Sequence, residues 1–167
     1  SIAGEEGYPA NVNFSVIYQL KGARLTCEMI GVPSAATPIN LAQHSYYNLN
    51  GTGDVRDHQI QIAAHTYTSV DANQIPTGEI LPVADSRFDF TKLTTFNLTD
   101  PDRIGVDHNL VLNATRDLKE PSATVFSRHS NLELRLWTQE PGLQLFNAPN
   151  MSIPVVGLNR EIYGPFS

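Results

Sequence analysis

The stretch Asn11–Leu20, which reads NVNFSVIYQL, shows most clearly how this chain folds. Its apolar side chains recur at every second position: Val12, Phe14, Val16, Tyr18 and Leu20. A period of two is that of a β-strand with one buried face, so the stretch predicts a half-buried strand. The following run, Arg24–Ile30, alternates in the same way. Lys21-Gly22 lies between the two runs, and the sequence therefore predicts a hairpin.

The same period returns along the rest of the chain. His58–Ile62 and Leu132–Leu136 alternate clearly, and shorter strand candidates are Tyr67–Val70, Glu79–Val83, Asn109–Leu112, Thr124–Ser127 and Leu143–Phe146. Turn clusters such as Pro141-Gly142 separate these runs, and we find no long helical stripe. The sequence predicts an all-β, antiparallel sandwich or barrel of many short strands. We see no linker that would split it into two domains.

Composition narrows the class of protein. The 167 residues include 11 Lys and Arg against 17 Asp and Glu, a net charge of −6. An acidic balance argues against a nucleic-acid partner, which would need a basic face. No apolar run approaches the roughly 20 residues that span a bilayer, so we expect no membrane partner. The single cysteine, Cys27, excludes an internal disulfide and alternates with apolar neighbours, which predicts a buried thiol.

Five histidines are the main candidates for chemistry: His44, His58, His65, His108 and His129. Asp57-His58 and Asp107-His108 pair a carboxylate with an imidazole. Neighbours on a strand point to opposite faces, so neither pair suits a joint metal site, and we expect no metal. No phosphate-binding loop, dinucleotide glycine motif or serine-hydrolase elbow occurs.

His44 stands out because polar and aromatic residues surround it between Pro38 and Leu49. Aromatic rings can stack on the C–H faces of a sugar while amides and hydroxyls meet its hydroxyl groups. The alternative is a hydrogen-bonded structural histidine with its tyrosines in the core. The pattern alone leaves both interpretations open.

An ordered series of motifs resembles the aldose 1-epimerase family, also called galactose mutarotases. The series covers nearly the whole chain and consists of Gly4–Pro9, Pro38–Leu49, Asp57-His58, Tyr67–Asp71, Ile75–Ile80, Phe88–Phe90, Gly105–Asn109 and Thr138–Gln144. Each piece is weak alone, but the order is specific. The resemblance implies a large antiparallel β-sandwich of the galactose mutarotase type, in agreement with the strand pattern.

The resemblance also implies a reaction and three site residues. The family interconverts the α and β anomers of free aldoses, such as galactose or glucose, and needs no metal or nucleotide cofactor. A general base takes the proton of the anomeric hydroxyl while a general acid protonates the ring oxygen, and the opened ring closes on its other face. His44 matches the catalytic acid, and an imidazole suits that role near neutral pH. Asp107 matches a carboxylate that grips sugar hydroxyls, and Gln144 an amide that contacts the sugar.

The chain also departs from the family pattern. The resemblance places residues 1–167 as a single partial domain, the C-terminal portion of the catalytic domain and incomplete at both ends. An arginine, a second histidine and the general-base glutamate of the family find no match, and neither Glu140 nor Glu161 fits the glutamate motif. We therefore expect a hexose partner, together with a second chain or fragment that completes the sandwich.

Other functions stay open from the sequence. Without the base, the chain would be a catalytically silent carbohydrate-binding fragment of the same fold. A glycosidase would need a paired acid and nucleophile or base. A sugar-phosphate epimerase would need a cluster of basic residues, which we do not see. Asparagine glycosylation motifs begin at Asn13, Asn97, Asn113 and Asn150, so a secretory setting is open beside a cytoplasmic one.

Overall fold

The computed structural model describes residues 1–157 and 162–167 and divides the chain into two compact units, Ser1–Tyr46 and Tyr47–Ser167. Each unit has its own hydrogen-bonded strands. The single partial domain expected from the sequence stays a prediction. Glu161, which the sequence analysis left without a role, lies outside the described residues.

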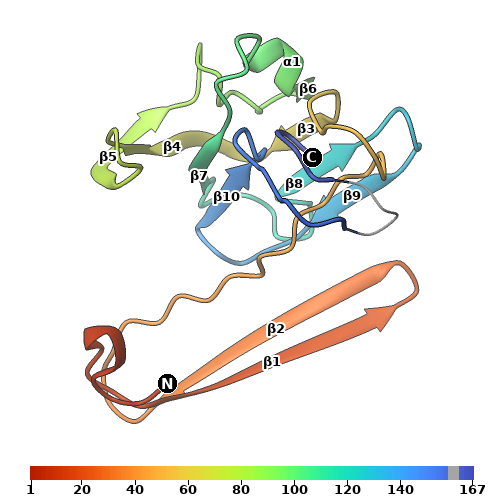
Figure 1. The fold of residues 1–167 in the computed structure, drawn as a ribbon. Helices are drawn as coiled ribbons and strands as arrows, with labels where there is room; N and C mark the ends of the chain where they lie inside the picture. The colour runs from red at the N-terminus through yellow and green to blue at the C-terminus, as the bar shows by residue number, and fades with distance from the viewer. Residues whose placement is uncertain (158–161) are drawn as a thin grey trace. The chain divides into compact units, whose positions relative to one another are not determined.

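The first unit is a long β-hairpin preceded by a short 3-10 turn, η1 (Glu5–Gly7). Strands β1 (Val12–Lys21) and β2 (Arg24–Pro33) pair antiparallel from Val12↔Pro33 to Lys21↔Arg24. Figure 1 shows the two strands side by side. The predicted hairpin is confirmed, and its turn consists of Gly22 and Ala23.

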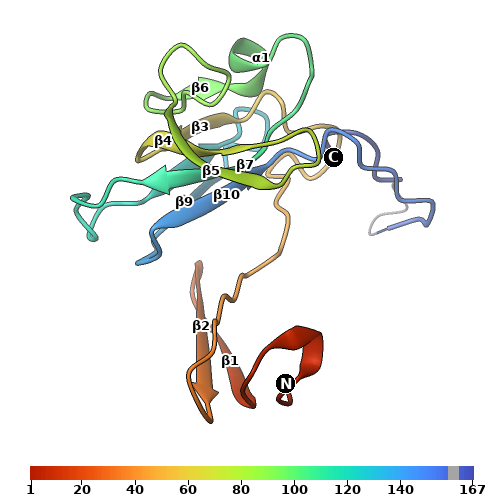
Figure 2. The ribbon, with the colours of Figure 1, turned by 90° about the vertical axis from the view of Figure 1, so that its left-hand side faces the viewer.

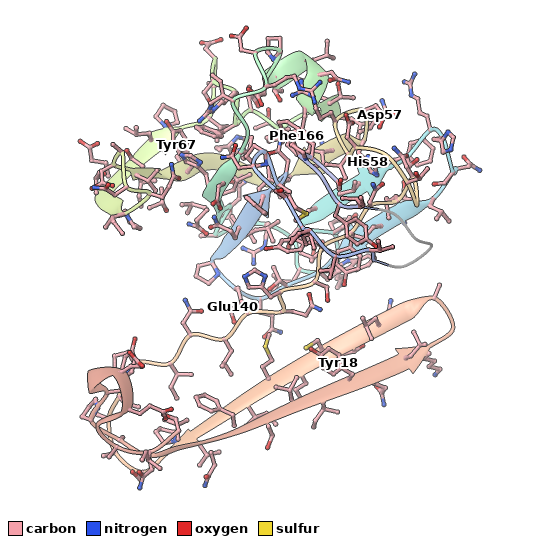
Figure 3. All side chains as sticks on the ribbon, viewed as in Figure 1. Tyr18, Asp57, His58, Tyr67, Glu140 and Phe166 are labelled. Atoms are coloured by element: carbon pink, nitrogen blue, oxygen red, sulfur yellow. The ribbon has the colours of Figure 1, made fainter. Side chains whose placement is uncertain are left out.

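The prediction that one face of this hairpin is buried was wrong. Val12 is buried, but Phe14, Val16, Tyr18 and Leu20 are between 44% and 74% exposed, and Figure 3 shows Tyr18 on β1. Cys27 is a free thiol of intermediate exposure, less buried than predicted. The reason is that a two-stranded ribbon has no second sheet within Ser1–Tyr46 to cover it, although the alternation of side chains is as expected.

The second unit contains two four-stranded antiparallel sheets, with strand orders β10-β7-β4-β5 and β6-β3-β8-β9. The first sheet comprises β4 (Ala64–Val70), β5 (Pro76–Pro82), β7 (Asp107–Leu112) and β10 (Gly142–Phe146). The second comprises β3 (Gln59–Ile62), β6 (Thr94–Thr95), β8 (Ala123–Phe126) and β9 (Glu133–Leu136). The one-turn helix α1 (Phe96–Thr99) follows β6, and the two views of Figures 1 and 2 place them together at one end of the unit.

The core of the second unit joins side chains from both sheets. Ile60 and Ile62 of β3 and Leu110 and Leu112 of β7 belong to one buried apolar cluster, together with Phe90. Burial alternates along both strands, as a period of two requires. The all-β antiparallel sandwich predicted from the sequence is confirmed. No helix in the described part of the chain has the length and apolar character to cross a membrane.

The segment near the C-terminus packs into this unit through Phe166. Its backbone N–H donates to the carbonyl of Ala148 at 2.7 Å, and its carbonyl accepts from Val55 N–H at 2.8 Å. The guanidinium groups of Arg56 and Arg103 lie 5.0 and 5.1 Å from the centre of the buried ring. Cations over an aromatic face are attracted by its quadrupole, so these contacts help to anchor the segment.

Asp57 and His58 lie just before β3, where Figure 3 labels them. The expectation that they point to opposite faces of a strand was wrong, because both precede the strand in a turn. His58 Nδ1 is 3.6 Å from Asp57 Oδ1, and Leu49 N–H donates to His58 Nε2 at 3.0 Å. Burial lowers the pKa of His58, although the negative charge of Asp57 opposes that shift. The buried ring is therefore a neutral acceptor that fixes the preceding loop, which is a structural role.

Candidate functional site

A hollow of about 290 Å³ lies on the sheet formed by β5, β4, β7 and β10. It is lined mainly by polar side chains and by the turn between β4 and β5: Thr68, Val70, Gln74, Pro76, Asp107, Asn109 and Gln144. The volume suits a small polar molecule. Two of the three predicted site residues, Asp107 and Gln144, lie in this one hollow.

The two-residue period of β7 places Asp107 and Asn109 on the face of the sheet that carries the hollow. His108 and Leu110 alternate with them and are buried on the opposite face, in the interior. On the neighbouring strand β10, Gln144 is paired with Asn109 and Phe146 with Asp107. Local strand geometry and register therefore bring Asp107, Asn109 and Gln144 together.

Two hydrogen bonds organise the floor of the hollow. The Gln144 side-chain amide Nε2 donates to Asp107 Oδ1 at 2.8 Å, and the Asn109 amide Nδ2 donates to Thr68 Oγ1 at 2.8 Å. The first bond has an ionised acceptor, which makes it stronger than a bond between neutral groups. A carboxylate offers several lone pairs and a primary amide two N–H groups, so the pair has capacity for further polar partners.

One wall of the hollow is a turn fixed by its own side chain. Asp71 Oδ1 accepts from the backbone N–H of Asn73 at 2.8 Å and of Ile75 at 3.0 Å. An aspartate that bonds the backbone beyond it in this way stabilises the turn. Gln74, which lines the hollow, lies in this turn between Asn73 and Ile75. These contacts give Asp71 a structural role in the turn.

His108 supports β7 from the core side of the sheet. Its ring centre lies 4.3 Å from that of Phe88 and 5.8 Å from that of Tyr67, which Figure 3 labels on β4. Burial lowers the pKa of His108, and the positive charge of Arg87 lowers it further. The neutral ring packs as an aromatic core residue, and it faces away from the hollow.

His44, the third predicted site residue, belongs to the first unit and is described apart from the other two. It is exposed, and its ring packs edge-on against Tyr46 with a centre-to-centre distance of 5.5 Å. Beside it, Gln43 Nε2 donates to Ser45 Oγ at 2.6 Å. The catalytic role expected for His44 stays a prediction. Within the described residues, no group of three or more His, Cys, Asp or Glu side chains could hold a metal ion.

Residues 1–161 match the family model described as Aldose 1-epimerase. The chain belongs to the aldose 1-epimerase family. Asp107 and Gln144, which the sequence resemblance assigned to sugar contacts, meet across the neighbouring strands β7 and β10.

Relatives within the family include the galactose mutarotase of Homo sapiens, 37% identical over 164 residues, and the aldose 1-epimerase of Escherichia coli, 34% identical over 152 residues. The alignments cover 96% and 86% of this chain but 48% and 44% of the relatives. The chain thus spans about half the length of the curated relatives it matches.

Solved structures agree with the fold. The GalM/aldose epimerase homologue from C. elegans superposes with a TM-score of 0.90 over 99% of this chain and 51% of its own, at 24% identity. The galactose 1-epimerase of Lactobacillus acidophilus superposes with a TM-score of 0.75 over 89% and 45%, at 26% identity. The chain therefore has the strand arrangement of aldose epimerase folds.

The sequence analysis missed Thr68, Gln74 and Asn109 as parts of the hollow. Asn109 could have been found, since it lies two residues after Asp107 and must share its face of the strand. Thr68 and Gln74 depend on which strands are neighbours and on the shape of one turn. The sequence pattern does not contain that information.

Proposed function

We propose that the protein acts in aldose 1-epimerisation, the exchange of α and β anomers of a free hexose such as galactose or glucose. The observation that carries this proposal is the hydrogen-bonded pair of Asp107 and Gln144 in a polar hollow. Both residues occupy positions that the family resemblance gives to sugar contacts. The relatives named galactose mutarotase and aldose 1-epimerase support the same activity.

The chemistry of the hollow fits a sugar. The Asp107 carboxylate is a charged acceptor for hydroxyl hydrogens, while the Gln144 amide can both donate and accept. Because the amide already contacts Asp107, its side chain is held in place before a ligand arrives. Fixed donors and acceptors lower the entropic cost of binding, and they select hydroxyl groups by position.

In this proposal His44 donates the proton that opens the ring. An imidazole can deliver a proton to the ring oxygen and recover it on closure. The resemblance assigns none of these 167 residues to the general base. We therefore propose that full anomer exchange needs a second chain or fragment that supplies this base.

A second function, sugar binding without catalysis, is favoured by one observation. The Asp107–Gln144 pair and all the lining of the hollow lie within the second unit. This unit could therefore bind a hexose when His44 takes no part. Binding and exchange can be measured separately, which makes the two functions distinguishable.

The test is to titrate the purified chain with galactose and with glucose by NMR, and to follow anomer exchange by polarimetry. Native mass spectrometry of the same material reveals any second chain. We expect Asp107→Asn and Gln144→Ala to weaken binding. In material that catalyses exchange, we expect His44→Ala to abolish the catalysed rate of anomer exchange while hexose binding is kept. The exposed His129 lies outside the hollow, so His129→Ala is the matched control.

Binding without exchange, in material with no second chain, would support the carbohydrate-binding alternative. An unchanged exchange rate in the His44→Ala variant would overturn the assignment of the acid. Absence of hexose binding to the wild-type protein would overturn both functions.

A further inference from the structure

The three residues before Asp107 have their backbone N–H groups bound by two buried side chains. Ile104 N–H donates to Asp100 Oδ1 at 3.0 Å, and Gly105 N–H donates to Asp100 Oδ2 at 2.8 Å. Val106 N–H donates to Asn147 Oδ1 at 2.9 Å. Three successive donors are thus satisfied by side-chain oxygens just where β7 begins. We call Asp100 and Asn147 the clamp.

Both clamp residues are almost fully withdrawn from solvent, with 2% of their surface exposed. Burying a carboxylate or an amide is unfavourable unless hydrogen bonds replace its lost contacts with water. The two carboxylate oxygens of Asp100 and the amide oxygen of Asn147 accept hydrogen bonds from backbone N–H groups of the segment that precedes Asp107. The Asn147 amide Nδ2 has no hydrogen-bond partner in the described chain, so this side chain serves as an acceptor.

The clamp residues are themselves fixed from two directions. Asp100 donates its backbone N–H to Phe96 at 2.8 Å, and its carbonyl accepts from Arg56 Nη2 at 2.9 Å. Asn147 donates its backbone N–H to the Val106 carbonyl at 3.1 Å, so these two residues are joined twice. This double contact continues the pairing of β7 and β10 beyond the Phe146↔Asp107 pair.

We propose that Asp100 and Asn147 are positioning residues for Asp107. They fix the start of β7 against β10, so that the Asp107 carboxylate meets the Gln144 amide at the depth and angle that a sugar requires. Neither residue lines the hollow, and they act through the backbone. Only the expected effect on sugar affinity rests on the proposed function; the positioning of Asp107 does not.

The first test is Asn147→Ala, which removes the acceptor of Val106 N–H and leaves that buried donor without a partner. We expect the affinity for galactose or glucose to fall about tenfold, the effect of one buried hydrogen bond lost. Asn147→Asp keeps the acceptor oxygen and should restore part of the affinity. Asp100→Asn keeps one of two acceptors and should give an intermediate loss.

A control separates positioning from general destabilisation. Ile62 lies in β3 of the other sheet and is buried in the core, so Ile62→Ala lowers stability without touching the clamp. Sugar affinity is compared at temperatures where the two variants have equal free energies of unfolding. If Ile62→Ala weakens binding as much as Asn147→Ala does, the clamp is merely structural and the inference is overturned.

A second readout needs no sugar. The side-chain amide protons of Gln144 report their contact with Asp107 through their NMR chemical shifts. We expect Asn147→Ala to move these signals and to speed hydrogen exchange at Val106, whereas Ile62→Ala leaves the Gln144 signals in place. Unchanged Gln144 signals in Asn147→Ala would overturn the positioning role. If the wild-type protein binds no hexose but the signals move, the proposed function fails and the positioning role stands.

Discussion

Substitution of Gly105 by alanine is the sharpest test of how closely the segment before β7 is packed. Gly105 has φ +94°, a backbone conformation that costs other residues about 1–2 kcal/mol. A Cβ atom there would also fall well inside contact distance of Cβ and Cγ of Pro149, and 3.3 Å from its Cδ. Overpacking against a rigid ring typically costs about 1–3 kcal/mol. We therefore expect Gly105→Ala to destabilise the fold by about 2–5 kcal/mol.

Gly78 is a matched control for the backbone part of this cost. It has φ +91°, and a Cβ there would meet nothing within 4 Å. Gly78→Ala should therefore cost only about 1–2 kcal/mol, so the difference between the two variants isolates the contact with Pro149. Replacing Pro149 by glycine in the Gly105→Ala background should recover part of the loss, as coupled neighbours do.

The assay is equilibrium unfolding in urea, followed by the fluorescence of Trp137, the one tryptophan of the chain. The slope of the free energy of unfolding against urea concentration should be the same in all variants, so that a shift of the midpoint reports a change in stability. The reasoning is refuted if Gly105→Ala is no more destabilising than Gly78→Ala. In that case the contact with Pro149 would carry no cost, and the segment before β7 would be free to move.

Three further predictions concern other parts of the molecule. Burial lowers the pKa of His58 below its ordinary value of 6.5, so the unfolded state binds a proton that the folded state lacks as pH falls through 6.5. The free energy of unfolding should therefore decrease as pH is lowered through that window. His58→Gln should make the free energy of unfolding depend less on pH there, and a variant with the same pH dependence as the wild type would contradict this. Gly142→Ala should displace the Asn109 carboxamide and break its bond to Thr68, at a cost of about 1 kcal/mol in urea unfolding. In the Gly142→Ala background, Thr68→Val should then cause little further loss of stability. If the losses of the two substitutions add fully, the expected displacement of Asn109 is wrong. The exposed apolar hairpin should make the purified chain oligomeric or prone to aggregate, and Val16→Lys should reduce the mass seen by analytical ultracentrifugation. A sharp, reversible, monomeric unfolding transition of the wild type would show that reasoning to be wrong.

Strand positions could be predicted from the sequence because side-chain alternation is a local property. The run that begins at Asn11 predicted β1 to within one residue at each end, and Leu143–Phe146 predicted all but the first residue of β10. Helix α1 was missed, because one helical turn is too short to show a period of 3.6. Burial was predicted less well, since the exposure of β1 depends on a partner layer that no strand encodes by itself.

The candidate site was predictable only in part for the same reason. Asp107 and Gln144 were found through family motifs, and the register of β7 and β10 brings them together. Their buried supports, Asp100 and Asn147, were not found. An isolated aspartate or asparagine in a sequence is typical of turns, and only the fold shows that each one is buried and bound to a backbone N–H.

The alternation along β7 has a consequence for anyone who wishes to change what this protein recognises. Odd-numbered positions of the strand, Asp107 and Asn109, face the hollow, and the even-numbered ones, His108 and Leu110, face the interior. Libraries confined to the odd positions and to Gln144 would explore ligand preference at little cost in expression or solubility. Libraries at the even positions would chiefly sample failures to fold. The positions of β7 to vary can thus be chosen by whether their residue number is odd or even, before any variant is made.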